Sequence, residues 1–228
     1  MKESQVFEFI RFCVNDKVAL PRDMERMDWA GLFRFCQEQA IAGVVFQRIE
    51  ALKGGKILCE QSVLKKRLEI PREVLLPWFA LSEQIKQRNM LMNQRCVELT
   101  EMLRKDGFDS CILKGQGNTV MYPNPYSRTP GDIDVWIKPK LEIRSEEVGH
   151  SGIIRYVRKR NPEGKVIYHH IDYGDFKGVE VEVHYRPSFM FNPIHNHRLQ
   201  QWFVENAEKQ FNHEVELPDG VGKIHVPT

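Results

Sequence analysis

Asp132 and Asp134 stand one residue apart at the start of an apolar run, residues 133–137. In a β-strand this spacing places both carboxylates on one face, because side chains alternate with a period of two. Two neighbouring anions repel each other unless a cation or a proton lies between them. Carboxylate oxygens suit Mg²⁺, so the pair predicts one side of a divalent-metal site. The alternative is a strand edge that carries two solvated acids.

A second acidic segment lies in residues 179–185, where apolar and polar residues alternate without a break. The alternation predicts a strand with Glu180, Glu182 and His184 on one face. If that face meets the aspartate pair, three carboxylates converge. Such a trio holds a pair of Mg²⁺ ions in nucleotidyl transfer, where the ions clamp the attacking and leaving oxygens at phosphorus.

A turn of small residues follows the short apolar run 111–113, which suits a buried strand. The turn reads Lys114-Gly115-Gln116-Gly117. A turn between a strand and a helix offers an anion unpaired backbone N–H groups and the positive end of a helix dipole. Lys114 adds a cation, so we expect this turn to hold the phosphate groups of a nucleotide.

The order of these motifs resembles that of a known family, the uncharacterised bacterial nucleotidyltransferases of the DNA polymerase beta-like nucleotidyltransferase superfamily. The resemblance covers about residues 75–210. The segments that carry it are Ile112-Leu113-Lys114-Gly115, Tyr122-Pro123, Arg128, Gly131-Asp132-Ile133-Asp134, and the acid Glu182 two residues before His184. The sequence departs from the superfamily pattern at Gln116, where Gly or Ser is usual, and the spacer to Asp132 is slightly long.

The resemblance implies roles for the acidic residues. Asp132, Asp134 and Glu182 would be catalytic and would bind Mg²⁺ or Mn²⁺, and Glu182 would help to remove the proton of the acceptor hydroxyl. Glu180 and His184 share the face of Glu182, so we expect them beside the metal-binding carboxylates and in support of them.

The resemblance also implies how the substrates bind. Lys114, Gly115 and Gln116 would contact the phosphates of an NTP. Arg128 would contact a phosphate or the acceptor, with an ion pair inside its own loop as the alternative. The acceptor would be a hydroxyl of a small molecule, a protein or a nucleic acid, and pyrophosphate would leave.

A non-catalytic member of the same fold is the competing interpretation. It would bind a nucleotide or a partner protein, as in a toxin–antitoxin-like pair, and Gln116 favours it. The set Asp132, Asp134 and Glu182 favours the enzyme, because a binding module has no need of clustered anions.

The pattern of periodicities predicts an α+β chain, with a helical N-terminal region and a nucleotidyltransferase-like mixed β-sheet with flanking helices. We place the helical region at residues 1–106 and the catalytic α/β core at residues 107–228. Residues 29–52 and 78–105 have helical patterns, and the second carries one apolar stripe.

Three further segments of the C-terminal half have weaker signals. Residues 166–171 predict a strand, residues 196–209 a short helix, and the remainder to Thr228 a polar tail.

The composition is that of an ordinary globular protein, with 28% charged residues, 42% hydrophobic residues and a formal net charge of +2. That charge gives no sign of electrostatic capture of nucleic acid or membrane. No run approaches the roughly 20 apolar residues that span a bilayer, and the N-terminus lacks a secretion signal. The 5 cysteines never form a Cys-x-x-Cys pair, which is typical of reduced thiols. We expect a cytoplasmic location and no membrane partner.

The 8 histidines raise the question of zinc. His169 and His170 are adjacent, so a strand would direct them to opposite faces. His195 and His197 have no cysteine or acid at zinc-site spacing. Surface or supporting roles are therefore favoured, and His184 is set apart because it shares the acidic face.

Overall fold

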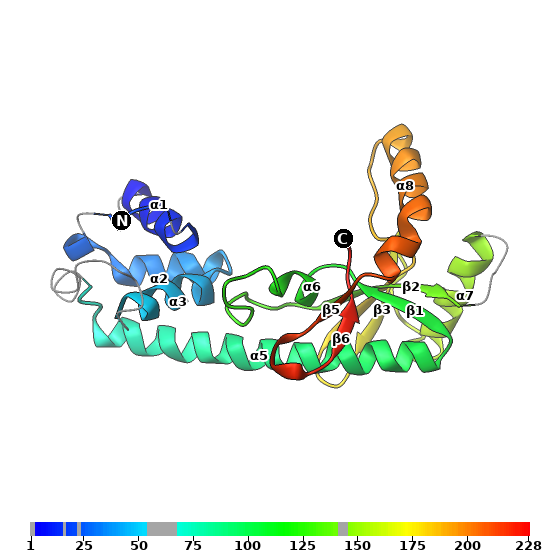
Figure 1. Ribbon diagram of the computed structural model, residues 1–228, viewed down its shortest axis with the longest axis horizontal. Coiled ribbons are helices and arrows are strands. Elements are labelled where there is room, and N and C mark those ends of the chain that lie inside the picture. The colour runs from blue at the N-terminus through cyan, green and yellow to red at the C-terminus, as the bar shows by residue number, and fades with distance from the viewer. Residues whose placement is uncertain (1–2, 16, 22–23, 54–67, 141–145) are drawn as a thin grey trace. The chain divides into compact units, whose positions relative to one another are not determined.

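Figure 1 shows a computed structural model of the chain, which describes residues 3–15, 17–21, 24–53, 68–140 and 146–228. The chain forms two compact units. The first contains Met1–Asn89 and Tyr122–Thr129, and the second contains Met90–Met121 and Pro130–Thr228. The domain boundary that we expect after residue 106 stays a prediction.

The first unit is helical throughout its described elements. These are α1 (Glu3–Val14), the 3-10 helix η1 (Met24–Arg26), α2 (Trp29–Glu38), α3 (Ala42–Lys53) and the first part of α5 (Arg72–Lys105). Trp78 of α5 stacks on Phe33 of α2 with the ring centroids 5.0 Å apart. The Trp78 indole N–H donates to the Ala42 carbonyl oxygen at 2.9 Å, so both the apolar body and the polar edge of the indole are anchored.

The prediction of one helical pattern over residues 29–52 needs a correction, because the chain breaks at Ala40 between α2 and α3. Ala40 has a φ of 55°, the left-handed conformation that ends many helices. Its N–H donates to the Gln37 carbonyl oxygen, and the N–H of Ile41 donates to that of Cys36. These two bonds form a Schellman motif, which usually has glycine at the position of Ala40.

The second unit is built on a mixed four-stranded sheet with the order β1-β2-β4-β3. Its strands are β1 (Phe108–Ile112), β2 (Ile133–Pro139), β3 (His170–Asp175) and β4 (Glu180–His184). The central pair β2 and β4 is parallel, and each outer strand is antiparallel to its neighbour. The chain therefore has the predicted α+β fold, with helices and a mixed sheet.

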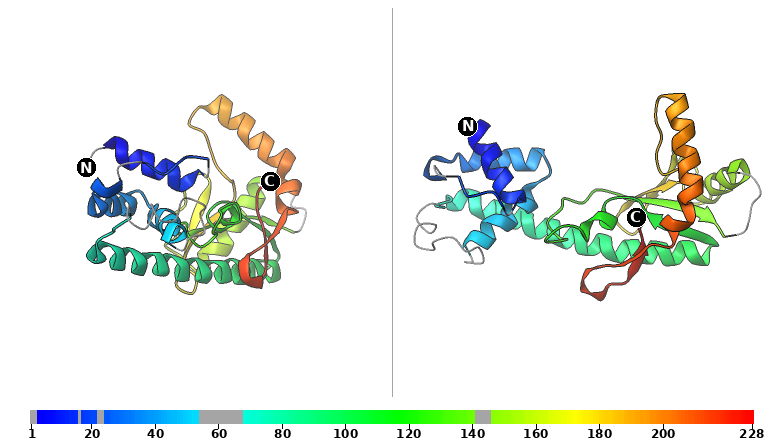
Figure 2. Two further views of the ribbon diagram at one scale, coloured as in Figure 1. Left: turned by 60° about the vertical axis from the view of Figure 1, so that its left-hand side comes forward. Right: turned by 45° about the horizontal axis from the view of Figure 1, so that its top comes forward.

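The two faces of the sheet pack against different helices (Figure 2). Val135 and Val183 belong to an apolar core shared with Leu99 of α5 and Val157 of α7 (Glu146–Arg158). Trp136 points to the other face and packs with its ring centroid 4.5 Å from that of Phe211 in α8 (Pro193–Phe211). The acids of β2 and β4 alternate with the core valines, so they share the face of Trp136.

The prediction of a strand over residues 166–171 was wrong in its boundaries. The predicted strand 166–171 is a tight reversal, since Asp172 N–H donates to the Lys165 carbonyl oxygen and Ile167 N–H donates to that of His170. The chain therefore turns at Tyr168 and His169, and the strand starts only at His170.

The predicted polar tail is ordered structure. Its elements are β5 (Glu214–Glu216), the 3-10 helix η2 (Pro218–Gly220) and β6 (Lys223–His225), and β5 and β6 pair antiparallel. Leu217, Ile224 and Val226 are buried in the core of the second unit, which explains why this segment folds back. The predicted helix 196–209 is also longer, because the Asn192 side chain caps it and accepts from the N–H groups of Ile194 and His195.

The described cysteines are free thiols, and most of them are buried. Cys36, Cys96 and Cys111 are buried free thiols, and burial raises the pKa of Cys96 and of Cys111 to about 12. Cys59 lies outside the described residues. In the part of the chain that the structure describes, every helix is too short or too polar to cross a membrane.

Candidate functional site

The acidic residues meet because β2 and β4 are parallel neighbours in a fixed register. Asp134 of β2 lies directly opposite Glu182 of β4. On the far side of β4, Asp172 of β3 lies opposite the same glutamate. Residues that pair across strands share a face, so three carboxylates form one row across the sheet. Asp132 precedes β2 by one residue and is half-buried.

Asp134 is the most buried acid of this row, with 2% of its surface exposed. Its Oδ2 lies 2.9 Å from Lys114 Nζ, and its Oδ1 lies 3.0 Å from His184 Nε2. Burial alone would raise the pKa of Asp134, but the hydrogen bonds with His184 and Lys114 outweigh burial and lower that pKa. Asp134 is therefore a fixed anion at the centre of the site.

Glu182 is in the opposite electrostatic situation. Burial, followed by the negative charges of Asp134 and Asp132, raises the pKa of its carboxyl group. Its Oε2 lies 3.5 Å from His184 Nε2, and about a third of its side chain is exposed, with 30% relative accessibility. The three predicted metal ligands therefore act on one another as crowded like charges, which a divalent cation would relieve.

The ligand atoms of Asp134, Glu182 and His184 lie within 4.8 Å of one another. Two carboxylate oxygens and an imidazole nitrogen at this spacing fit a divalent cation. His184 also fits as a ligand because its Nδ1 faces the Arg186 carbonyl oxygen at 3.3 Å. With a proton on Nδ1 the lone pair of Nε2 would point toward Asp134 and could bind a cation there, whereas a proton on Nε2 would make a hydrogen bond with Asp134.

The predicted phosphate turn adjoins Asp134. The N–H of Leu113 donates to the Asp134 carbonyl oxygen at 3.0 Å, which brings the end of β1 beside the acid. Gly115 follows with a φ of 59° and ψ of −112°, a conformation that glycine adopts without strain. It precedes the four-residue helix α6 (Gln116–Thr119). Lys114 and Gly115 therefore lie beside Asp134, and their contact with phosphate stays a prediction.

Gln116 lies in a different environment from the one expected. Its side chain is buried, with 2% exposed, and its Nε2 donates to Asn93 Oδ1 of α5. The neighbouring Gly117 is closely packed, since an added Cβ would lie 3.0 Å from Val226 and 3.1 Å from the Ile112 carbonyl oxygen. The side chain of Gln116 thus joins the turn to α5 by a hydrogen bond.

Two other predicted residues have contacts of a different kind. Glu180 is exposed at the start of β4 and pairs with Asp175 across the strands. Arg128 belongs to the first unit, where its carbonyl oxygen accepts from Asn89 Nδ2 at 2.7 Å. The contact of Arg128 with a substrate stays a prediction.

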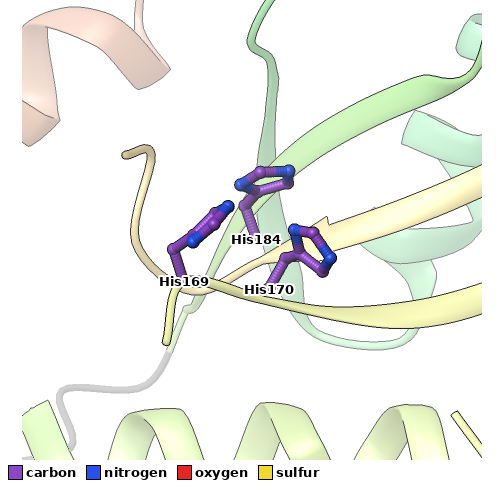
Figure 3. A group of neighbouring side chains, drawn as sticks. All are labelled: His169, His170 and His184. Atoms are coloured by element: carbon purple, nitrogen blue, oxygen red, sulfur yellow. The ribbon is translucent and has the colours of Figure 1, made fainter. Parts of the chain in front are cut away.

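Three histidines lie close together (Figure 3), which the sequence did not predict. Two of them contact the acids, since His170 Nδ1 lies 3.2 Å from Glu182 Oε2 and His184 Nε2 lies 3.0 Å from Asp134 Oδ1. The ring centroids of His169 and His170 are 4.7 Å apart, and those rings lie 5.3 Å and 5.0 Å from the ring of His184. The expectation of opposite faces was wrong because the chain turns at His169, so strand alternation begins only with the next residue. Burial, followed by the neighbouring histidines, lowers the pKa of both His169 and His170.

Asp172 was missed for a related reason. His170 and Asp172 are two residues apart, as Glu182 and His184 are, and the two pairs lie opposite each other on β3 and β4. An antiparallel alignment of the two segments could therefore have predicted that Asp172 lies near Glu182. This alignment was hidden because the strand boundary was placed before His169.

A cavity of about 540 Å³ begins at Trp136, the next residue after Asp134 on the same face of β2. It is lined by residues of β1, β2, α7 and α8, by Lys140 and by residues 185–187. Aromatic and cationic side chains among them are Trp136, Tyr185, Phe203, Lys138, Lys140 and Arg186. Its volume is that of a small-molecule site.

Comparison with known proteins was made at the level of families, curated proteins and solved structures. The sequence profile of a family described as uncharacterised nucleotidyltransferases matches residues 25–217. The chain belongs to this nucleotidyltransferase family. No curated protein and no solved structure matched the chain. Membership of the family supports a general role in nucleotidyl transfer and implies an NTP as substrate.

Proposed function

We propose that the chain is a metal-dependent enzyme that transfers a nucleoside monophosphate from an NTP to a hydroxyl acceptor and releases pyrophosphate. The observation that carries this proposal is the direct pairing of Asp134 with Glu182 on parallel strands, with Lys114 2.9 Å from Asp134. Together with Asp132, these residues combine crowded anions with an adjacent cation, which is the combination that a metal-bound triphosphate needs.

Mg²⁺ or Mn²⁺ held by Asp132, Asp134 and Glu182 would supply positive charge at the reacting phosphate and at the acceptor oxygen. Family membership favours a divalent metal, and the crowding of the carboxylates favours a cation among them.

Lys114 and Gly115 would bind the triphosphate. Burial alone would lower the pKa of Lys114, but the Asp134 carboxylate outweighs burial and raises that pKa, so the ammonium group stays charged. The side chain is 60% exposed beyond this contact and can turn to a phosphate oxygen. Gly115 has no side chain, so phosphate can approach the backbone of the turn closely.

Glu182 would accept the proton of the acceptor hydroxyl. In the metal-free chain, burial and the negative charges of Asp134 and Asp132 raise the pKa of Glu182, so its carboxylate takes up a proton more readily than that of an exposed glutamate. The part of its side chain that remains exposed leaves room for an acceptor to approach.

The cavity that begins at Trp136 would hold the part of a substrate that does not react. Its aromatic residues suit a flat ring, and its cations suit a polar or anionic group. The chemical identity of the acceptor is left open by this assignment.

A non-catalytic nucleotide-binding or protein-binding module is the second candidate. One observation favours it. Lys114 contacts one carboxylate oxygen of Asp134 and His184 contacts the other, so the charge of this acid is balanced within the chain without a metal ion. In such a module these contacts would be structural, and nucleotide would not be consumed.

Label transfer from an NTP separates the two candidates. The full chain is incubated with Mg²⁺, NTP labelled at either the α or the γ phosphate, and small-molecule, RNA or protein fractions as acceptors. We expect the α label to become attached to an acceptor while the γ label leaves with pyrophosphate. Asp134→Asn should abolish the transfer, and the matched variant of an exposed aspartate on β3, Asp175→Asn, should not.

Two results would contradict the enzymatic proposal. One is transfer of the γ label instead of the α label. The other is equal transfer by the wild-type chain and Asp134→Asn, which would assign the activity to another site or to a contaminant.

A further inference from the structure

The three histidines next to the acids form a second group of metal-ligating side chains, of which His184 also contacts Asp134 of the carboxylate site. His169 lies in the turn before β3, His170 starts β3, and His184 ends β4 (Figure 3). One ring nitrogen from each lies within 4.8 Å of one from each of the others. Imidazole nitrogens bind Zn²⁺ and similar first-row transition metals, whereas Mg²⁺ prefers oxygen ligands.

Two ring nitrogens of this group are buried polar atoms without a hydrogen-bond partner among the described residues. They are Nδ1 of His169 and Nδ1 of His170. The latter lies 3.2 Å from Glu182 Oε2, but no hydrogen bond joins the two atoms. A buried polar atom without a partner costs free energy, so two of them side by side need an explanation.

The surroundings of His170 and His184 direct a lone pair into the group. His170 Nε2 faces Asp172 Oδ1 at 3.4 Å, so a proton on Nε2 would leave the lone pair of Nδ1 for the group. His184 Nδ1 faces the Arg186 carbonyl oxygen at 3.3 Å, so that oxygen can accept the proton of Nδ1 when a metal ion occupies Nε2, which contacts Asp134 in the metal-free chain. Carboxylate or carbonyl partners of this kind orient metal-binding histidines in known sites.

His169 is held in place by packing. Its ring stacks on Phe189 with the centroids 5.0 Å apart and the planes inclined by 27°. Phe189 in turn contacts Tyr168, whose ring centroid lies 5.6 Å away. The stacking contact holds the ring in place and covers one of its faces.

We propose that His169, His170 and His184 bind one first-row transition-metal ion of the Zn²⁺ class, at a site distinct from the Mg²⁺ site of the carboxylates. Three imidazoles leave one position of a tetrahedral ion open. Glu182 is the nearest acid to His170 and is placed to fill that position or to stay with the carboxylates. The proposal does not depend on nucleotidyl transfer.

Occupation of this site would act on the carboxylates through His184. The ring now contacts Asp134 through Nε2 at 3.0 Å, and binding of an ion by that nitrogen would end the contact. The transition metal would therefore change the partners of Asp134 without being bound by it.

Cobalt titration of the full, reduced chain in excess Mg²⁺ tests the site, because tetrahedral Co²⁺ absorbs visible light strongly. We expect one equivalent of Co²⁺ to bind, without thiolate-to-cobalt charge-transfer absorption, and Zn²⁺ to displace it. His169→Gln lies outside the strands and should weaken binding by about tenfold or more. The control His195→Gln changes an exposed histidine of α8 and should bind as the wild type does.

Further variants keep the test decisive. His170→Asn should lose affinity as well, and circular dichroism of each variant confirms that it is folded. Asp132→Asn should keep the cobalt site, because its acid belongs to the carboxylate group. Loss of the cobalt signal in Asp132→Asn, or equal binding by the wild type, His169→Gln and His170→Asn, would overturn the proposal. Absence of a one-equivalent site in the wild type, or thiolate absorption, would do the same.

Discussion

Asp134 makes the central charged contacts of the candidate site. Its carboxylate contacts a lysine from the phosphate turn and a histidine from the neighbouring strand, while Glu182 lies directly opposite. Asp134 therefore joins the predicted phosphate site to the predicted metal site. Its replacement should affect both stability and activity.

Asp134→Asn should lower the stability of the metal-free chain. The variant removes the charge that Lys114 and His184 contact, at a cost of about 1 kcal/mol. The sequence alone suggests the opposite, because deleting one of several clustered anions relieves repulsion. Thermal denaturation in the presence of a chelator measures the difference, with Asp175→Asn as the control. A rise in Tm would show that repulsion among the acids outweighs the contacts with Lys114 and His184.

Lys114→Met should raise the KM for NTP by about tenfold, because a charged contact with phosphate is lost. Lys159→Met removes an exposed lysine that follows α7 and serves as the control. Steady-state kinetics with the label-transfer assay gives the comparison. An unchanged KM in Lys114→Met would place the triphosphate elsewhere.

The sequence predicted which residues share a strand face where apolar and polar residues alternate over a long segment. Asp132 and Asp134 could be placed on one face of their strand, and Glu182 and His184 on one face of theirs, because both segments alternate. His169 and Asp172 could not, since a reversal of the chain at His169 leaves no signal such as glycine or proline. Contacts between side chains from three strands depend on register, which the sequence did not determine.

At the scale of elements, the turn between α2 and α3 is the clearest example of a feature hidden from the sequence. Ala40 occupies the left-handed position of a Schellman motif, where glycine is the usual signal. In contrast, the apolar stripe of α5 was visible, because its core residues Met92, Cys96, Leu99 and Leu103 recur at helical spacing.

Ala40→Gly should stabilise the chain by about 0.5–1 kcal/mol, because glycine adopts a positive φ without the steric cost of a Cβ. The matched change Ala51→Gly lies inside α3 and should destabilise the chain by about 1 kcal/mol. Urea denaturation followed by circular dichroism measures both. A loss of stability in Ala40→Gly would show that the gain in the folded state is smaller than the added freedom of the unfolded chain.

At the scale of the whole molecule, the second unit contains the sheet, the phosphate turn and every predicted metal ligand. The family match at residues 25–217 includes parts of both units. The sequence predicted the helical and sheet regions from their periods, but it did not predict that the C-terminal segment forms β5 and β6. Leu217, Ile224 and Val226 are scattered among polar residues, and only the packed core shows that they are buried.

Nucleotide binding tests the central claim most directly, because it requires no knowledge of the acceptor. Calorimetry of the full chain with an NTP analogue that cannot be cleaved between its α and β phosphates would be done with Mg²⁺ and with a chelator. We expect binding that depends on Mg²⁺ and is weakened about tenfold or more in Asp134→Asn, while Asp175→Asn binds as the wild type does. Equal binding by the wild type and Asp134→Asn, or no Mg²⁺-dependent binding by the wild type, would contradict the claim that these carboxylates form a nucleotidyltransferase site.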